Sequence, residues 1–240
     1  MEETVNSVLN SIHPAVEIIL INDGSTDNTE EIGKRLEGQN ENVFYYYQQN
    51  SGPSVARNHG ISKAKGIYIL PLDSDDIISK DYISEAVKVF EKDAEVKVVY
   101  CEAEKFGEKS GRWHLKPFSL EALALNNMIF VSAVYKKADW ERCGGYSEDM
   151  VWGREDWEFW ISMLKNGGKV VKLSIIGFYY RIRSNSRRKG MTNERKEKII
   201  NYINTKHKDF IYKQLNGPLR FQRTHSRKYN SFLKMLGLLK

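Results

Sequence analysis

Apolar runs alternate with amphipathic stretches along the first hundred residues of the chain. Four short apolar runs predict buried strands, at 16–21, 43–47, 67–70 and 96–100. Between them, apolar positions recur with helical spacing, at 27–36, 53–64 and 80–90. A strand–helix–strand rhythm of this kind is typical of a parallel sheet with helices on both faces. The pattern therefore predicts an α/β fold.

After Cys101 the alternation becomes less regular. Four segments predict a mixture of helices and shorter strands, typical of an added substrate-binding half, at 120–125, 131–135, 156–165 and 169–175. A longer helix is expected at 196–215, where Gly217 and Pro218 follow and end it. A final helix is expected at 229–239.

Charge divides the chain unevenly. The net charge is +6, yet residues 181–240 hold 17 lysines and arginines against 3 acidic residues, which leaves the first 180 residues net negative. This asymmetry suggests an acidic catalytic body and a basic tail that meets something anionic. A membrane surface, nucleic acid and a merely solvated pair of basic helices are the alternatives, and nucleic acid is the least favoured.

Composition narrows the class of protein. The chain is 41% hydrophobic and 28% charged, which is not the composition of a disordered protein. Cys101 and Cys143 lie far apart without C-x-x-C spacing, so they predict neither a disulfide framework nor a thiolate metal site, and a reducing, cytosolic compartment is expected. The histidines show no ligand spacing, and we expect them in solvated or capping positions.

Three carboxylates cluster just past the strand predicted at 67–70. Asp73, Asp75 and Asp76 repel one another and lose hydration there, so a cation or a charged ligand would have to compensate them. Because α/β sheets bind ligands at the carboxyl ends of their strands, the cluster indicates a metal–diphosphate site. The alternative is a helix cap, since Asp76 or Ser79 could cap the helix at 80–90.

Two other turns contain candidate ligand contacts. Asp23 lies in the turn 22–27 after the first strand, where it can accept two N–H donors of a base or belong to an ordinary connection. Arg57 lies one turn into the helix at 53–64, and helix N-termini attract phosphate. Neither a P-loop nor a G-x-G-x-x-G fingerprint is present.

Glu155 and Asp156 open an aromatic-rich helix in the segment 153–160. A carboxylate at such a helix start could take a proton from a sugar hydroxyl, beside an aromatic wall that stacks on the sugar ring. The alternative is an acidic first turn followed by a buried aromatic face.

Together these motifs resemble those of the family-2 inverting glycosyltransferases, which have the GT-A fold. The resemblance covers about residues 1–185 and rests on five motifs in the same order: I-L-I-N-D-G-S-T-D-N, S-G-P-S-V-A-R-N-H-G, L-P-L-D-S-D-D, C-G-G-Y-S-E-D-M and G-R-E-D-W-E-F-W. It implies that each candidate residue has its own role: base recognition for Asp23, a place near the base and phosphates for Arg57, the ribose for Asp73, a divalent cation (Mg²⁺ or Mn²⁺) for Asp75, and catalytic base for Asp156. Glu155 would support the base rather than react.

The resemblance also implies an organisation and a reaction. A GT-A domain at 1–185, with a Rossmann-like, mostly parallel sheet, would divide into a nucleotide-binding half (1–101) and an acceptor-binding half (102–185), followed by a basic helical extension (186–240). The enzyme would move a hexosyl group from a nucleotide-sugar donor, expected to be a UDP-sugar, to a glycan or lipid-linked acceptor. We expect it to act in cell-surface polysaccharide synthesis, in the cytoplasm, with the basic tail in peripheral contact with the inner face of the membrane.

The chain departs from the family pattern at both ends of this domain. Family members usually begin with a strand that contributes to the nucleotide pocket, whereas this chain begins inside the next helix, 2–10, so we expect truncation or an omitted leader. A histidine that completes some metal sites of the family is not evident at 180–186, where Arg181 and Arg183 could bind phosphate instead. The second protein ligand of the metal is therefore left open.

Two other functions compete with this interpretation. A sugar-1-phosphate nucleotidyltransferase also uses an acidic metal site, but it normally needs a glycine-rich N-terminal phosphate loop, which the visible chain lacks. A non-catalytic module could instead use the basic tail to bind a membrane or nucleic acid. Pyrophosphate release from a nucleoside triphosphate would favour the first, and salt-sensitive binding without donor turnover would favour the second.

Overall fold

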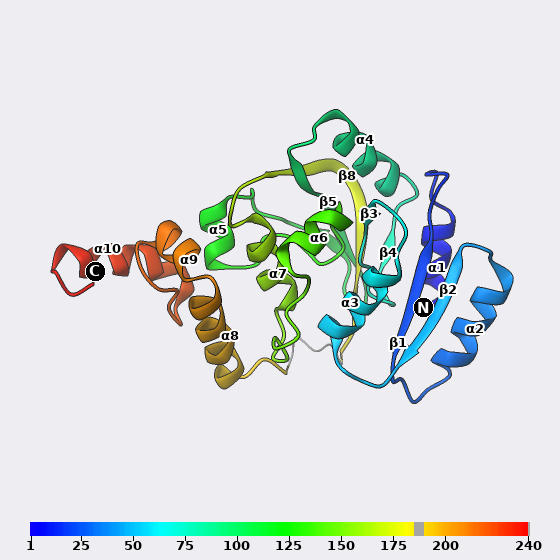
Figure 1. Cartoon of the computed structure of the whole chain (residues 1–240), viewed down its shortest axis with the longest axis horizontal. Coiled ribbons are helices and arrows are strands. Elements are labelled where there is room, and N and C mark those ends of the chain that lie inside the picture. Colours follow the sequence, from blue (N-terminus) through cyan, green and yellow to red (C-terminus); the bar gives the residue numbers. More distant parts are fainter. Residues whose placement is uncertain (185–189, 240) are drawn as a thin grey trace.

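The computed structural model describes residues 1–184 and 190–239 of the chain. Two sheets with flanking helices form the body, and the last helices of the chain extend from one end of it (Figure 1). The predicted α/β fold is confirmed. The differences from the prediction concern how the strands pair and how far they extend.

The first sheet lies at the N-terminal end of the body (Figure 1). The elements of this region are α1 (Glu2–Leu9), β1 (Ile18–Asp23), α2 (Thr29–Gln39), β2 (Val43–Gln48) and α3 (Pro53–Lys63). β1 and β2 pair in parallel, and α3 packs against β1. Because Asp23 lies opposite Gln48 in this register, both strands end at the same edge, which is where α3 begins.

The second sheet is mixed rather than mostly parallel. Its strand order is β3-β7-β5-β8-β4, with β6 beside β5: β3 (Tyr68–Ile69), β4 (Ile77–Ile78), β5 (Val96–Gly107), β6 (Gly111–Trp113), β7 (Val134–Lys136) and β8 (Lys169–Ile182). β5 and β8 pair in parallel, whereas the other neighbours are antiparallel. Both long strands extend well past the apolar runs expected at 96–100 and 169–175, because pairing with each other continues to Gly107 and Ile182.

Four helices pack against the second sheet and against one another: α4 (Tyr82–Lys92), α5 (Leu120–Leu125), α6 (Lys137–Cys143) and α7 (Glu155–Leu164). The main core is rich in aromatic side chains, including Trp157, Phe159 and Trp160 from α7. The indole N–H groups of Trp157 and Trp160 donate to the backbone oxygens of Leu123 and Ile129, at 2.6 and 3.0 Å. The aromatic side chains that follow Asp156 on α7 are therefore buried in the core. This is the alternative given above to an aromatic wall that stacks on the sugar.

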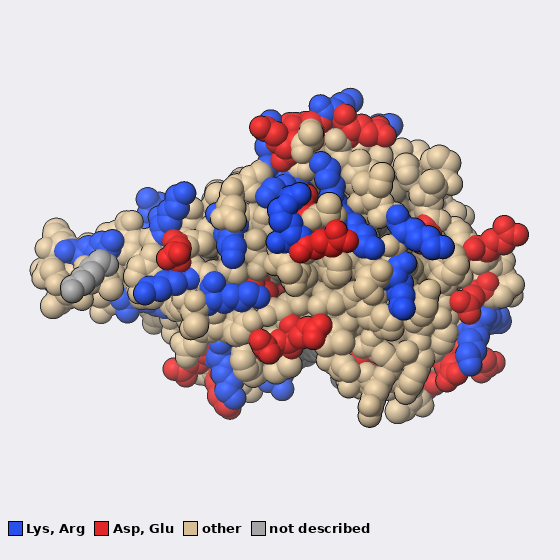
Figure 2. All heavy atoms as spheres, in the orientation of Figure 1, with Lys and Arg blue, Asp and Glu red and all other residues tan. Residues whose placement is uncertain are grey.

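The last helices of the chain are α8 (Asn193–Lys206), α9 (Lys208–Leu215) and α10 (Ser226–Met235). The single helix expected at 196–215 is wrong, because the backbone leaves the helical conformation at His207. Buried side chains of α8 and α9, such as Ile203 and Ile211, belong to the same core cluster as α7. Among the charged side chains at the end of the molecule that these helices form, Lys and Arg predominate (Figure 2).

The acidic cluster does not cap a helix. Asp76 is followed by β4, and α4 begins only at Tyr82, with no side-chain cap. The Oδ1 atom of Asp76 instead accepts a hydrogen bond from the backbone N–H of Arg181 at 2.8 Å, and the Ser79 hydroxyl has no partner. The cap prediction for Asp76 or Ser79 is therefore wrong.

Within residues 1–184 and 190–239, every helix is too short or too polar to cross a lipid bilayer.

Candidate functional site

Arg57 connects two of the predicted motifs. Its Nη2 atom donates to Asp73 Oδ1 at 2.8 Å, and its Nη1 atom donates to Glu155 Oε1 at 2.7 Å. Asp73 follows β3 and Glu155 opens α7, so one guanidinium joins the end of a strand to the start of the helix that carries Asp156. Residues far apart in sequence, expected on the donor and acceptor sides, are thereby brought together.

The environment keeps Arg57 firmly cationic. Burial by itself favours the neutral form, but Asp73, Tyr146 and Glu155 outweigh it, and the pKa of Arg57 is raised. The guanidinium carbon also lies 5.6 Å from the centre of the Tyr146 ring. Because both Nη atoms are engaged with carboxylates, Arg57 positions these two carboxylates as well as lending positive charge to the site.

Asp156 is a half-buried carboxylate with uncharged partners. Its Oδ2 atom accepts from Asn127 Nδ2 at 2.6 Å, and its Oδ1 atom accepts from the backbone N–H of Trp157 at 2.8 Å. Burial, and after it the charge of Glu155, raises the pKa of Asp156 to about 6. At neutral pH the group is ionised yet close to its pKa, which is the condition that suits a general base.

Asp23 fastens the turn between β2 and α3. Its Oδ1 atom accepts from Gln48 Nε2 and from the backbone N–H of Ser51, both at 2.8 Å, and its Oδ2 atom accepts from the N–H of Gly52 at 2.9 Å. An ionised carboxylate has about four acceptor positions, so one is left for the N–H of a ligand. Asp23 therefore stabilises this turn, and one acceptor position is left for the predicted contact with the base.

Asp75 lies beside two arginines from the end of β8. Its Oδ2 atom is 3.2 Å from Arg183 Nε, and its backbone oxygen accepts from Arg181 Nε at 2.7 Å. Arg181 also pairs with Glu3, so it is engaged within the protein rather than held free for phosphate. In the ranges 1–184 and 190–239, no group of three or more His, Cys, Asp or Glu side chains could hold a metal ion.

Asp76 is the buried member of the acidic cluster. Its Oδ2 atom has no hydrogen-bond partner in the described structure, and the residue is 1% exposed. Burial raises the pKa of Asp76 to about 8, so the carboxyl group is mainly protonated at neutral pH. A neutral, buried group does not share the chemistry of the half-exposed Asp73 and Asp75, which reduces the charge that a cation has to compensate.

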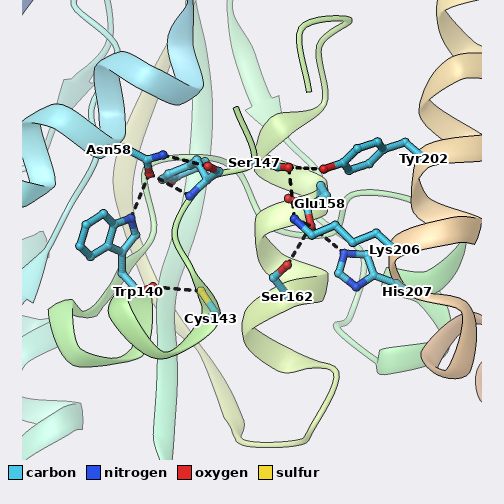
Figure 3. A network of polar contacts seen from close by, with 10 residues as sticks. Asn58, Trp140, Cys143, Ser147, Glu158, Ser162, Tyr202, Lys206 and His207 are labelled. Atoms are coloured by element: carbon cyan, nitrogen blue, oxygen red, sulfur yellow. Dashed lines mark hydrogen bonds and ion pairs between the residues drawn. The ribbon is translucent and has the colours of Figure 1, made fainter. Parts of the chain in front are cut away.

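Asn58 is a positioning residue that the sequence analysis did not single out. Its side chain bonds both backbone groups of Tyr146, at 2.8 and 2.9 Å, and accepts from Trp140 Nε1 at 3.2 Å (Figure 3). Gly145 has φ +72°, and a Cβ atom there would lie 2.8 Å from Asn58 Oδ1. The glycine is required for this close approach, which places Tyr146 against Arg57.

Glu158 joins α7 to the C-terminal helices. Its Oε1 atom accepts from Ser162 Oγ at 2.8 Å and lies 2.6 Å from His207 Nε2 and 3.0 Å from Lys206 Nζ (Figure 3). Burial favours the neutral acid, but His207, Lys206 and Ser162 hold the pKa of Glu158 below its ordinary value. His207 is 2% exposed and so is not solvated, but it stands at the capping position between α8 and α9, which was the other expectation for the histidines.

A hollow of about 560 Å³ lies beside α3, between Asn58, His59, Trp140 and Glu148. None of the five predicted site residues (Asp23, Arg57, Asp73, Asp75 and Asp156) lines it.

Family models match most of the chain. Residues 1–151 match the model for glycosyl transferase family 2, and residues 131–185 match a model described as the N-terminal domain of galactosyltransferase. The Bacillus subtilis protein TuaG, a putative teichuronic acid biosynthesis glycosyltransferase, is 32% identical over 190 residues, which are 78% of this chain and 75% of TuaG. The glycosyltransferase GlyG of Streptococcus pneumoniae is 37% identical over 53% of this chain and 44% of its own length.

Solved structures support the same fold. S. aureus TarS in complex with UDP-GlcNAc has a TM-score of 0.73 at 20% identity, covering 97% of this chain and 71% of that one. The Pyrobaculum calidifontis mannosyltransferase PcManGT, in complex with GDP-Man and Mn²⁺, has a TM-score of 0.64 at 18% identity, covering 83% of this chain and 60% of that one. The GT-A fold and the resemblance found in the motifs are confirmed, and the chain belongs to glycosyl transferase family 2.

Proposed function

We propose that this glycosyltransferase moves a sugar from a nucleoside-diphosphate donor, expected to be a UDP-sugar, to a hydroxyl group of a glycan or lipid-linked acceptor. The anomeric configuration inverts, and the product is part of a cell-surface polysaccharide. The similarity to TuaG supports the polysaccharide, and the UDP-GlcNAc complex of TarS supports the donor class.

The bridge made by Arg57 is the observation that carries this proposal. It links Asp73, where the donor ribose is expected, to Glu155, the neighbour of the proposed base. A donor held at Asp73 and an acceptor held at Asp156 would then meet across a single guanidinium. Such positioning of two reactants is a large part of what an enzyme contributes to a displacement reaction.

The proposed reaction is a single displacement. Asp156 takes the proton of the acceptor hydroxyl group as the oxygen forms its bond to the anomeric carbon. The bond from that carbon to the diphosphate breaks at the same time, and the nucleoside diphosphate leaves with the electron pair. Attack from the face opposite the leaving group inverts the configuration, and one base with no enzyme nucleophile suffices.

We assign Asp75 as the protein ligand of a divalent cation, Mg²⁺ or Mn²⁺. Mg²⁺ is commonly bound by one or two carboxylates together with substrate phosphates, so the half-exposed carboxylate of Asp75 fits this chemistry although the described part of the chain holds no cluster of three or more ligand side chains. The cation would offset the charge that builds up on the leaving diphosphate. The Mn²⁺ in the PcManGT complex supports the assignment.

We further propose that 1–185 is the catalytic domain, with halves at 1–101 and 102–185, and that the basic extension 186–240 rests on the cytoplasmic face of a membrane through α8, α9 and α10. Residues 185–189 and 240 of these ranges lie outside the described residues. Exposed apolar side chains of α10 and of the residues after it lie among lysines and arginines there: Tyr229, Phe232, Met235, Leu236 and Leu238. Basic and apolar side chains together favour an anionic membrane surface. Salt-sensitive binding to vesicles that contain anionic lipid tests this contact.

Release of nucleoside diphosphate from a panel of nucleotide sugars tests the function. The purified chain should turn over at least one donor, and a chelator or Asp75→Ala should abolish this turnover. Asp209→Asn, at an exposed position in the first turn of α9, serves as the control and should keep it. Full turnover by Asp75→Ala would refute the metal assignment, and turnover of no donor by the wild type would refute the function.

A further inference from the structure

A small hollow beside the first turn of α7 is lined by cationic and aromatic side chains. It encloses about 170 Å³ between α7, α8 and the segment before α10, and its lining includes Arg154, Trp157, Lys196, Phe221 and Arg223. Ligand pockets usually measure about 300 Å³ or more, so this hollow suits one sugar ring or one ionic group rather than a whole nucleotide sugar. The residues proposed to hold the donor do not line it.

The cations of this hollow have no acidic partner in the part of the chain that the structure describes. Arg223 Nη1 donates to Asn126 Oδ1 at 2.8 Å, and Arg154 Nη1 reaches the same oxygen at 3.5 Å. Lys196 Nζ has only Asn193 Oδ1, at 3.4 Å. A guanidinium has five N–H donors, so most of the donors that face the hollow are left for a ligand.

Arg223 shows that this excess of positive charge is unfavourable in the free protein. Its guanidinium carbon lies 5.3 Å from the centre of the Trp157 ring, where it is half-buried. Burial, and after it the charge of Arg154, lowers the pKa of Arg223. An anion between the two arginines would relieve both effects, because its charge compensates for the hydration lost on burial and offsets the repulsion between the two cations.

Two residues that line the hollow, Arg154 and Trp157, flank the proposed base Asp156 in the sequence. Arg154 has φ +67°, a left-handed conformation that is strained for a residue other than glycine and is frequent at functional sites. Arg154 lies two residues before Asp156, and its charge opposes the rise in the pKa of that carboxyl group. The side-chain oxygen of Asn126 accepts hydrogen bonds from both arginines. The next residue, Asn127, donates a hydrogen bond to Asp156. A group bound in the hollow would therefore lie next to the reacting hydroxyl.

We propose that this hollow binds an anionic group of the acceptor, a phosphate or a carboxylate, and so presents a neighbouring hydroxyl to Asp156. The inference rests on the proposed function, and it narrows the acceptor to an acidic glycan or a phosphate-linked chain. Arginine pairs with both anions in two-point geometry, and the aromatic rings offer faces to a sugar.

Binding of three small probes to the whole chain tests the inference without requiring turnover. The probes are glycerol 3-phosphate, methyl glucuronide and the neutral methyl glucoside, measured by calorimetry and by tryptophan fluorescence. At least one anionic probe should bind and the neutral one should not. Arg223→Gln with Lys196→Gln should weaken anion binding by about tenfold or more, because the charge-assisted contacts are lost. Whichever anionic probe binds more tightly shows whether the hollow prefers a phosphate or a carboxylate.

The matched control removes the same charge elsewhere. Lys92→Gln with Lys109→Gln, at exposed positions that do not line the hollow, should leave anion binding unchanged. Equal binding of the neutral probe, or an equal loss in both double variants, would overturn the inference. A thermal shift with UDP, measured on the same proteins, reports the fold and the donor site separately. If no nucleotide raises the unfolding temperature of the wild type, that result counts against the proposed function. Binding of the three probes would still test whether the hollow takes an anion.

Discussion

Asp156 and Glu158 lie two residues apart on α7, yet their carboxylates have opposite environments. Asp156 is half-buried and its hydrogen-bond donors are uncharged, from Asn127 and from the backbone of Trp157. Since burial and the neighbouring Glu155 both favour the neutral acid, the pKa of Asp156 is raised to about 6.

Glu158 is 0% exposed, and burial alone would raise the pKa of its carboxyl group too. The pKa of Glu158 is instead held below its ordinary value, because His207, Lys206 and Ser162 all contact its Oε1 atom. Partners, rather than depth, decide which form of a carboxyl group the protein stabilises. Within the first turn of α7, the contrast therefore supports the proposed chemistry at Asp156 and shows that Glu158 attaches the C-terminal helices.

The largest effect is expected from Asp156→Asn. The amide keeps the shape of the side chain but cannot take a proton, so nucleoside-diphosphate release that depends on an acceptor should fall by about a thousandfold. The thermal unfolding midpoint should stay near that of the wild type. An activity within about tenfold of the wild type would show that another group acts as the base.

Glu158→Ala should act on stability. Removing Glu158 leaves Lys206 without a countercharge and buried His207 without its hydrogen-bond partner, and the free energy of unfolding at pH 7 should fall by about 3 kcal/mol. Urea unfolding measures this loss. Glu85→Ala is the control, because Glu85 pairs with Lys88 on the surface and should cost less than about 1 kcal/mol.

Lowering the pH should reduce the loss of stability caused by Glu158→Ala. The pKa of Glu158 is lowered in the folded protein, so its contribution to stability is present above the unfolded pKa of about 4.3 and is lost as the pH falls through the folded value. The destabilisation by Glu158→Ala should therefore shrink below about pH 4. A loss that stays constant down to the acid transition would contradict the lowered pKa.

Arg57→Lys should have a smaller effect on activity. A lysine keeps the positive charge but cannot contact Asp73 and Glu155 in the two-point geometry of a guanidinium. Donor turnover should fall by about tenfold to a hundredfold, as expected for misplaced reactants. Unchanged turnover would mean that the bridge does not position the site.

The smallest change is expected from Glu155→Gln. Removing this like charge should lower the pKa of Asp156, so the rising limb of the pH–activity profile should move to lower pH. Glu91→Gln, at an exposed position of α4, should leave the limb in place. A shift to higher pH would show that the loss of the contact with Arg57 dominates.

Local patterns predicted the elements of the first hundred residues well. The strand expected at 43–47 and the helix expected at 53–64 match β2 and α3 to within a residue, because apolar spacing and Pro53 mark them directly. β5 and β8 extend much further than their apolar runs, since their length depends on pairing between distant strands. The helix break falls at His207, which contacts Glu158 of α7, and no local pattern reveals a contact between such distant residues.

The candidate site was predictable as a set of residues but not as a network. The motifs led to Asp23, Arg57, Asp73, Asp75 and Asp156, whose catalytic and binding roles stay predictions. That Arg57 would hold Asp73 and Glu155 could not be read from spacing, because the contact to Glu155 spans 98 positions. Asn58 and Gly145 lay inside the quoted motifs, yet only their close approach in space explains them.

The pH dependence of kcat/KM for donor and acceptor tests the central claim, that Asp156 is the catalytic base, most directly. The raised pKa predicts activity that rises with unit slope through about pH 6, as Asp156 loses its proton, and then levels off. Asp156→Asn should abolish this limb. A wild-type profile that is already flat from pH 4.5 upward, or a limb that survives in Asp156→Asn, would contradict the account.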